Sequence, residues 1–245
     1  MRSARLACTA WLLLPLMATG AETALFNGTA VARSGEVLYT ERHEVTGRCG
    51  NGYWVPEQHR VDYRKPDSDA AFATKTLDYP SGLLLPEMIF RQPDFSEVMK
   101  VTLDSDQVSI KWTTPSGNNK TFELAIPDRL VIDAGFDHFI RAHWERLTGG
   151  NSARFRFLGP TRGEHYGFVA EPANTGDFEA RHEFRIRPDG LVTRFLVDPI
   201  YLGYDDEGFL TDFSGLTNIR KNRDRNFTAH IRYNQQNSPP CPLLP

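Results

Sequence analysis

The sequence lacks the local motifs that mark most catalytic, phosphate-binding and metal sites. It contains no HExxH, no CxxC, no GxxxxGK[ST] or GxGxxG loop and no Gly-x-Ser-x-Gly. We therefore predict no catalytic residues and no cofactor. A hydrolase remains an alternative, because a site assembled from separate strands leaves no motif in the sequence.

The sequence also lacks clusters of metal ligands. Its seven histidines are scattered, and His138 and His143 are five residues apart, so one helix would point them in different directions. We predict no metal site, and we expect Asp205–Gly208 to be a solvated turn rather than a calcium loop. Glu41 and Glu57, on neighbouring predicted strands, could face each other, as pairs on antiparallel strands often do without catalysis.

Positive charge is not in excess. Lys and Arg number 28 against 31 Asp and Glu, and the formal net charge is −3. Such a chain has no electrostatic surface for nucleic acid and no polybasic stretch for anionic lipid. We expect no nucleic-acid partner and, at most, transient contact with a membrane. The sequence does not indicate the oligomeric state.

The only long apolar stretch is at the N-terminus, where Arg2 and Arg5 precede an apolar run that ends before Thr19-Gly20-Ala21. This layout is typical of a signal peptide and too short to span a bilayer. We predict cleavage near Ala21, which takes the formal charge from −3 to −5, and a periplasmic or secreted protein. A retained N-terminal anchor is the alternative.

Cysteine is scarce, with three residues in the chain. Cys8 lies in the predicted signal peptide, which leaves Cys49 in a glycine-rich turn and Cys241 in a proline-rich tail. An even pair in an exported protein predicts one disulfide. Two unpaired thiols or a redox site is the alternative.

Short segments with period-two alternation dominate the rest of the chain and predict strands. Pro80, Pro86 and Pro93 interrupt residues 80–95, whose apolar side chains we expect to plug an open side of the sheet rather than to form a hydrophobic lip. With no linker, we predict one β-rich domain at 22–245, with a C-terminal tail at 234–245. The predicted strands lie at 24–32, 36–45, 53–64, 70–79, 97–103, 107–114, 120–126, 153–159, 164–171, 178–187, 191–198, 199–204, 209–213 and 225–233.

One helix is predicted, at residues 133–150, with Asp133 as the N-cap and Gly149 and Gly150 at the end. Its apolar side chains recur every three or four residues and share one face. A helix this short needs cover, which a sheet can provide. The apolar face consists of Phe136, Phe139, Ile140, Trp144 and Leu147.

These elements predict a mainly β fold, in which a strongly curved antiparallel sheet or half-open barrel wraps around a single central helix. A cavity between sheet and helix would hold an apolar or amphiphilic ligand, such as a lipid. A dry, packed core would instead indicate a scaffold or assembly protein. The predicted ligand-binding residues are Phe136, Phe139, Ile140 and Trp144.

The order of strands, aromatic helix and further strands, closed by residues 206–233, resembles exported Gram-negative proteins of the lipoprotein-carrier (LolA/LolB-like) type. The resemblance extends over most of residues 22–245 and concerns the pattern of elements rather than any sequence signature. It implies a half-barrel around an apolar cavity that binds lipoprotein acyl chains or other amphiphiles. It assigns no role to any residue.

Overall fold

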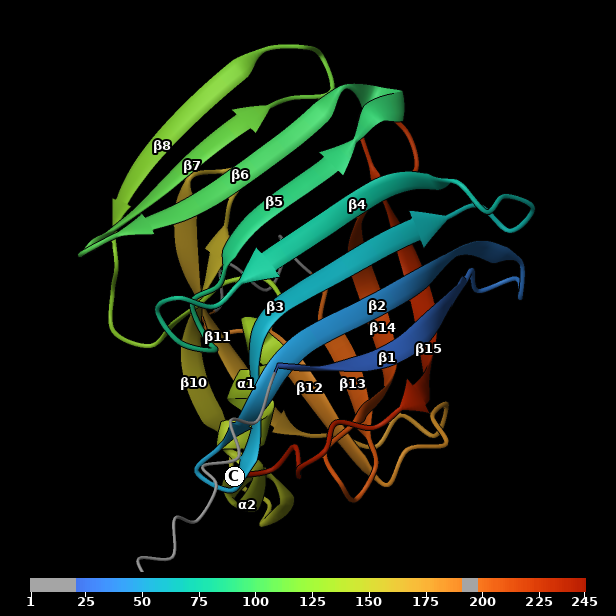
Figure 1. The fold of residues 1–245 in the computed structure, drawn as a ribbon, viewed down its shortest axis with the longest axis vertical. Coiled ribbons are helices and arrows are strands. Elements are labelled where there is room, and N and C mark those ends of the chain that lie inside the picture. Colours follow the sequence, from blue (N-terminus) through green and yellow to red (C-terminus); the bar gives the residue numbers. More distant parts are fainter. Residues whose placement is uncertain (1–20, 191–197) are drawn as a thin grey trace, which may run out of the picture.

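The protein is built on one large sheet with two short helices (Figure 1). The structure is a computed structural model that describes residues 21–190 and 198–245. In these two ranges, the strands form one 15-stranded sheet in the order β8-β7-β6-β5-β4-β3-β2-β1-β15-β14-β13-β12-β11-β10-β9. Neighbouring strands are antiparallel, except for β9 beside β10. The predicted mainly β class is therefore confirmed.

Two groups of strands follow one another along the chain, one before and one after the helices. The first group is β1 (Glu22–Val31), β2 (Val37–Gly50), β3 (Tyr53–Arg64), β4 (Ala71–Asp78), β5 (Glu87–Gln92), β6 (Glu97–Asp104), β7 (Gln107–Thr113), β8 (Asn119–Ala125) and β9 (Leu130–Val131). The second group is β10 (Ala153–Gly159), β11 (Glu164–Pro172), β12 (His182–Pro188), β13 (Ile200–Tyr204), β14 (Leu210–Arg220) and β15 (Asn226–Asn237).

The β2–β3 hairpin shows how local sequence sets the register. Asn51 and Gly52 both have positive φ, 54° and 89°, as a two-residue hairpin turn requires. Along β2, Tyr39, Glu41 and His43 are buried on one face, while the residues between them are more exposed. The predicted alternation is present, but the inward face carries two ionisable side chains.

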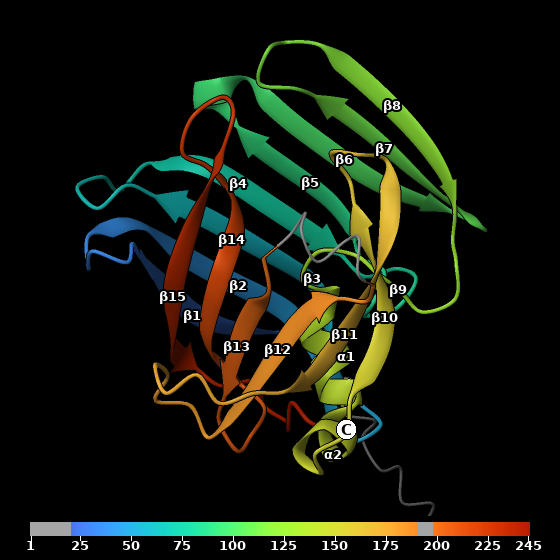
Figure 2. The same ribbon diagram turned by 180° about the vertical axis from the view of Figure 1, so that it is seen from behind.

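The two halves of the sheet face each other. Figure 1 shows β2–β7 in front of β12–β15, and Figure 2 shows the same order from behind. Arg220 of β14 connects the halves, because its guanidinium pairs with Glu97 of β6 at 2.5 Å and its backbone amide donates to Gln92 Oε1 of β5 at 2.9 Å. The sheet stays open, however, with β8 and β9 as its ends. Of the predicted strongly curved sheet or half-open barrel around a single helix, the structure thus shows the coarser part: one mostly antiparallel sheet that does not close.

The predicted single helix is two. Helix α1 runs Gly135–Ala142 and α2 runs Trp144–Thr148, separated by His143 at φ −115° and ψ 20°. Asp133 is not the N-cap. It has φ 42°, and its Oδ1 accepts from Lys75 Nζ of β4 at 2.7 Å, a contact that the local sequence could not reveal.

The proline-interrupted segment at 80–95 contains β5, flanked by a loop and by the short 3-10 helix η1 (Pro93–Phe95). Its loop packs on α1, because the Leu84 carbonyl accepts from Ile132 N at 3.0 Å and lies close above Gly135. This packing is closer to the predicted plug than to a lip, although β5 is an interior strand of the sheet. Of the predicted strand at 191–198, residues 191–197 lie outside the described ranges, as does nearly all of the predicted signal peptide, including Cys8.

The predicted disulfide is present between Cys49 of β2 and Cys241, with Cα atoms 6.0 Å apart. Strand β15 extends to Asn237, so residues 234–237 of the predicted tail belong to the sheet. Trp54 N donates to the Pro242 carbonyl at 2.7 Å. These contacts hold the remaining tail against β2 and β3.

Candidate functional site

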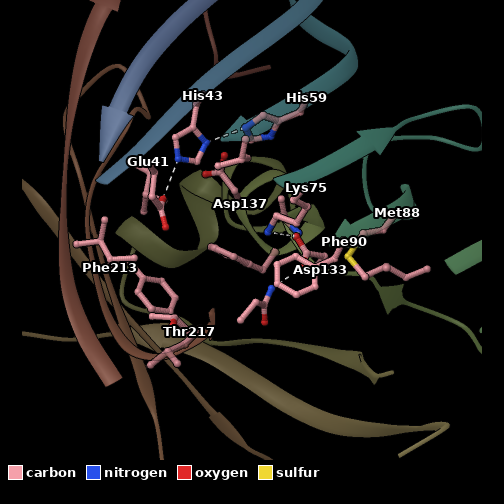
Figure 3. Close-up of a pocket in the computed structure, with 18 of the residues that line it drawn as sticks. Glu41, His43, His59, Lys75, Met88, Phe90, Asp133, Asp137, Phe213 and Thr217 are labelled. Carbon is pink, nitrogen blue, oxygen red and sulfur yellow. Dashed lines mark hydrogen bonds and ion pairs between the residues drawn. The ribbon is translucent and has the colours of Figure 1, made fainter. Parts of the chain in front are cut away.

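A cavity of about 480 Å³ lies between the two halves of the sheet (Figure 3). This volume is within the range of about 300–1,000 Å³ that is usual for small-molecule sites. Most of its wall is apolar and comes from strands of both halves and from α1. Representative apolar lining residues are Phe26, Val61, Met88, Phe90, Phe136 and Phe213.

The lining reaches the C-terminal tail. Pro239 and Leu243 contribute to it, and they follow β15 on either side of Cys241. The disulfide therefore fixes a segment that forms part of the wall. Such a constraint acts mainly by reducing the freedom of the unfolded chain.

Two histidines and a glutamate form a hydrogen-bonded chain on the cavity wall (Figure 3). His43 Nε2 lies 2.8 Å from Glu41 Oε2, and His43 Nδ1 lies 2.8 Å from His59 Nε2. Phe26 stacks on the His43 ring with centroids 4.2 Å apart. Burial, and then the neighbouring His43, lowers the pKa of His59 well below its usual value, so His59 is neutral near neutral pH.

Two ion pairs lie where α1 meets the cavity. Asp133 accepts from Lys75 Nζ at 2.7 Å and from Asn218 Nδ2 at 2.8 Å. Asp137 pairs at 2.9 Å with Arg141, which is one turn further along α1, and accepts from the Tyr204 hydroxyl at 3.0 Å. Burial raises the pKa of Asp137, and Arg141 opposes this shift.

Beside these ion pairs, Tyr79 and His138 also belong to the cavity lining. The Tyr79 hydroxyl is buried and has no hydrogen-bond partner in the described part of the chain. Burial raises the pKa of Tyr79 far above neutral pH, so the hydroxyl keeps its proton. Burial, with Arg141 nearby, lowers the pKa of His138 to about 3. The two rings meet edge to face at 5.4 Å.

A third ion pair lies on the wall between β6 and β14. Glu97 accepts from the Arg220 guanidinium and from Trp112 Nε1, the latter at 2.9 Å. Both partners of the pair are largely buried, with side chains 11% and 4% exposed for Arg220 and Glu97. The buried Lys and Arg side chains of the lining thus each have a carboxylate partner.

The predicted ligand-binding residues do not act as one group. Phe136 lines the cavity. Phe139 and Ile140, on the same apolar face of α1 as Phe136, are buried in the core, and Trp144 packs against Phe184 and Tyr204. These three are not part of the lining, and Phe139 instead packs on Phe155 with centroids 4.6 Å apart.

Sequence reasoning missed His43, His59 and Tyr79, and it considered Glu41 only as a partner of Glu57. A signal was present in β2, where ionisable residues occupy the same alternating face as Tyr39 and Val45. Glu41 and Glu57 do not form a pair, because Glu41 lies opposite Tyr63 in the sheet and Glu57 is exposed beside Arg48. Within residues 21–190 and 198–245, no three His, Cys, Asp or Glu side chains are placed to hold a metal ion.

Comparisons with known proteins leave the family open. No protein-family model and no curated protein matches the chain. Among solved structures, it is similar to a β-barrel-like protein of a domain of unknown function (DUF1849) from Brucella abortus, with a TM-score of 0.41 and 9% identity over 88% of this chain and 95% of that chain. The lipoprotein-carrier resemblance thus finds no family match. None of the helices in the described ranges is long and apolar enough to cross a membrane.

Proposed function

We propose that this chain is an exported protein of the cell envelope that binds an apolar or amphiphilic ligand, such as a lipid or a lipoprotein acyl chain, in the cavity between the sheet halves. The observation that carries the proposal is the cavity of about 480 Å³ with a mainly apolar wall. A volume of this size favours binding over a scaffold with a dry core, because well-packed cores leave few voids larger than a water molecule. This is the function of the carriers that the order of elements resembles.

The compartment is part of the proposal. The Cys49–Cys241 disulfide is of a kind that persists in the periplasm or outside the cell. The N-terminal sequence pattern supports export. Recovery of a protein that begins after Ala21 from the periplasmic or secreted fraction is expected, and recovery of the full-length chain from the membrane would contradict it.

Binding is tested with Nile red, an uncharged dye whose fluorescence rises in apolar surroundings. We expect saturable binding to the purified, oxidised protein, and lipid in its solvent extract by mass spectrometry. Met88→Trp adds a large side chain to the lining and is expected to weaken dye binding by about tenfold. The control, Val37→Trp, adds the same side chain at a position that is 40% exposed and outside the cavity.

Thermal unfolding shows whether each variant is folded. Absence of both dye binding and co-purified lipid would contradict the proposed function. Equal dye affinity of the two tryptophan variants would place the dye outside the cavity and would also count against it.

A second candidate function is hydrolysis, favoured by the Glu41–His43–His59 chain at the cavity. In the described ranges, the hydrogen-bond partners of the two imidazoles are each other and Glu41, so water rather than a side-chain hydroxyl would have to be the nucleophile. Release of fatty acid from an ester such as monolaurin, lost in His43→Ala, would support this function. No release by the wild-type protein would remove it.

A further inference from the structure

The charges on the cavity wall indicate whether a charged ligand group would find a partner there. Four cationic side chains of the described residues line the cavity. Three of them are buried, and each is paired with a carboxylate: Lys75 with Asp133, Arg141 with Asp137, and Arg220 with Glu97. The fourth, Arg162, is exposed, where water and salt screen its charge.

The buried wall also carries one carboxylate without a Lys or Arg partner. Glu41 is 6% exposed, and its nearest basic partner is His43. Among the Lys, Arg, Asp and Glu side chains of the lining, three largely buried cations therefore stand against four largely buried carboxylates. A carboxylate or phosphate brought into this cavity would lose its hydration without gaining a free cation, which costs free energy.

Neutral hydrogen-bonding groups, by contrast, are available. The Tyr79 hydroxyl is a buried donor without a partner in the described ranges, and leaving a polar group in this state costs free energy. A ligand oxygen that accepts from it would remove that cost. His138, next to Tyr79 and neutral, adds a second polar contact.

We propose that the cavity selects an amphiphile whose polar group is uncharged, such as a hydroxyl, ester or amide, and that Tyr79 donates a hydrogen bond to it. This inference rests on the proposed function and narrows it, because it disfavours free fatty acids and anionic phospholipid head groups. Glu41 acts against anions through its charge, and the three ion pairs leave no cation to offset it.

The test is competition against bound Nile red at about pH 8, where ordinary histidines are neutral. The two competitors are monolaurin, which has a glycerol ester head, and laurate, which has the same acyl chain and a carboxylate. Both are used below the concentrations at which they form micelles. We expect monolaurin to displace the dye at a concentration at least about tenfold lower than laurate, equivalent to about 1.4 kcal/mol.

Two variants test which side chains cause the preference for monolaurin over laurate. Glu41→Gln removes the unpaired charge, and it is expected to narrow the difference between the competitors about threefold by improving laurate alone. Tyr79→Phe removes the donor, and it is expected to weaken monolaurin about threefold to tenfold, calculated with the Nile red affinity of the same variant. The controls are Glu57→Gln and Tyr53→Phe, which make the same changes at positions outside the cavity.

The outcomes separate the two proposals. If Nile red does not bind, the proposed function fails. If Nile red binds and laurate displaces it as well as monolaurin does, ligand binding stands and the uncharged head group is wrong. If monolaurin is preferred but Tyr79→Phe leaves its affinity unchanged, the role of Tyr79 is wrong. If Glu41→Gln fails to fold, comparison of the competitors on wild-type protein and on Tyr79→Phe still decides the proposal.

Discussion

Two groups of side chains on helix α1 differ in kind. Phe139 and Ile140 are 1% and 0% exposed and pack into the core. Phe136, Asp137 and His138, in the first turn of the helix, line the cavity. The apolar stripe that predicts a ligand site from the sequence lies mostly in the core. Strong amphipathicity therefore located the core, and the polar flank of the same helix lies at the cavity.

The largest expected effect is the loss of stability when a core side chain of α1 is truncated. Phe139→Ala removes a ring that is 1% exposed and packs against Phe155, and it should lower the free energy of unfolding by about 3–5 kcal/mol. Chemical denaturation measures the change. Dye affinity, measured where the variant is still folded, should change little. A loss below about 1 kcal/mol would mean that this face is not tightly packed.

Phe136→Ala makes the same truncation at a residue that lines the cavity. Its ring already borders open space, so the substitution enlarges an existing cavity and should cost only about 1–2 kcal/mol of stability. Nile red affinity should fall clearly, because apolar contact area is lost. If Phe136→Ala lost as much stability as Phe139→Ala and kept its dye affinity, Phe136 would be a core residue and not part of the cavity wall.

The features that the sequence predicts are mainly those that depend on interactions between residues close together in the chain, or on the number of cysteines. The Asn51-Gly52 hairpin, the meander of β6, β7 and β8, and the Cys49–Cys241 pair depend on local turn chemistry or on simple counting. The break at His143, by contrast, leaves no clear signal in a continuous helical pattern.

The candidate site depends on long-range contacts. Lys75 meets Asp133, and Glu97 meets Arg220, across 58 and 123 residues of sequence. The cavity exists because two halves of one sheet face each other, and no local pattern encodes that arrangement. Only the inward Glu41 and His43, on an otherwise apolar alternating face, indicated a polar site in the sequence.

The free energy of unfolding should also depend on pH, through two histidines that line the cavity. The pKa of His138 is lowered to about 3, and that of His59 is lowered as well, so both histidines bind protons more readily when unfolded. Stability is therefore full above about pH 6.5 and falls as pH decreases toward the folded-state pKa, by up to about 1.4 kcal/mol per pH unit for each histidine. Denaturation at several pH values should show this slope.

His138→Gln should make the dependence of unfolding free energy on pH shallower. Of the two histidines, only His59 would then bind a proton more readily in the unfolded state than in the folded state. The control is His165→Gln, which makes the same substitution in the β10–β11 hairpin, outside the cavity lining. A slope that is the same in wild type and in His138→Gln would show that His138 is not buried at the cavity.

The smallest expected effect is the most specific. Tyr79→Phe deletes a hydroxyl that is buried without a hydrogen-bond partner in the described ranges, so the free energy of unfolding should stay within about 0.5 kcal/mol of wild type or rise. Tyr204→Phe is the matched control, because its buried hydroxyl donates to Asp137 at 3.0 Å and its loss should cost about 1–3 kcal/mol. Chemical denaturation of both variants measures the difference. Equal losses would show that the Tyr79 hydroxyl already has a partner, and a ligand oxygen would then have nothing to gain from it.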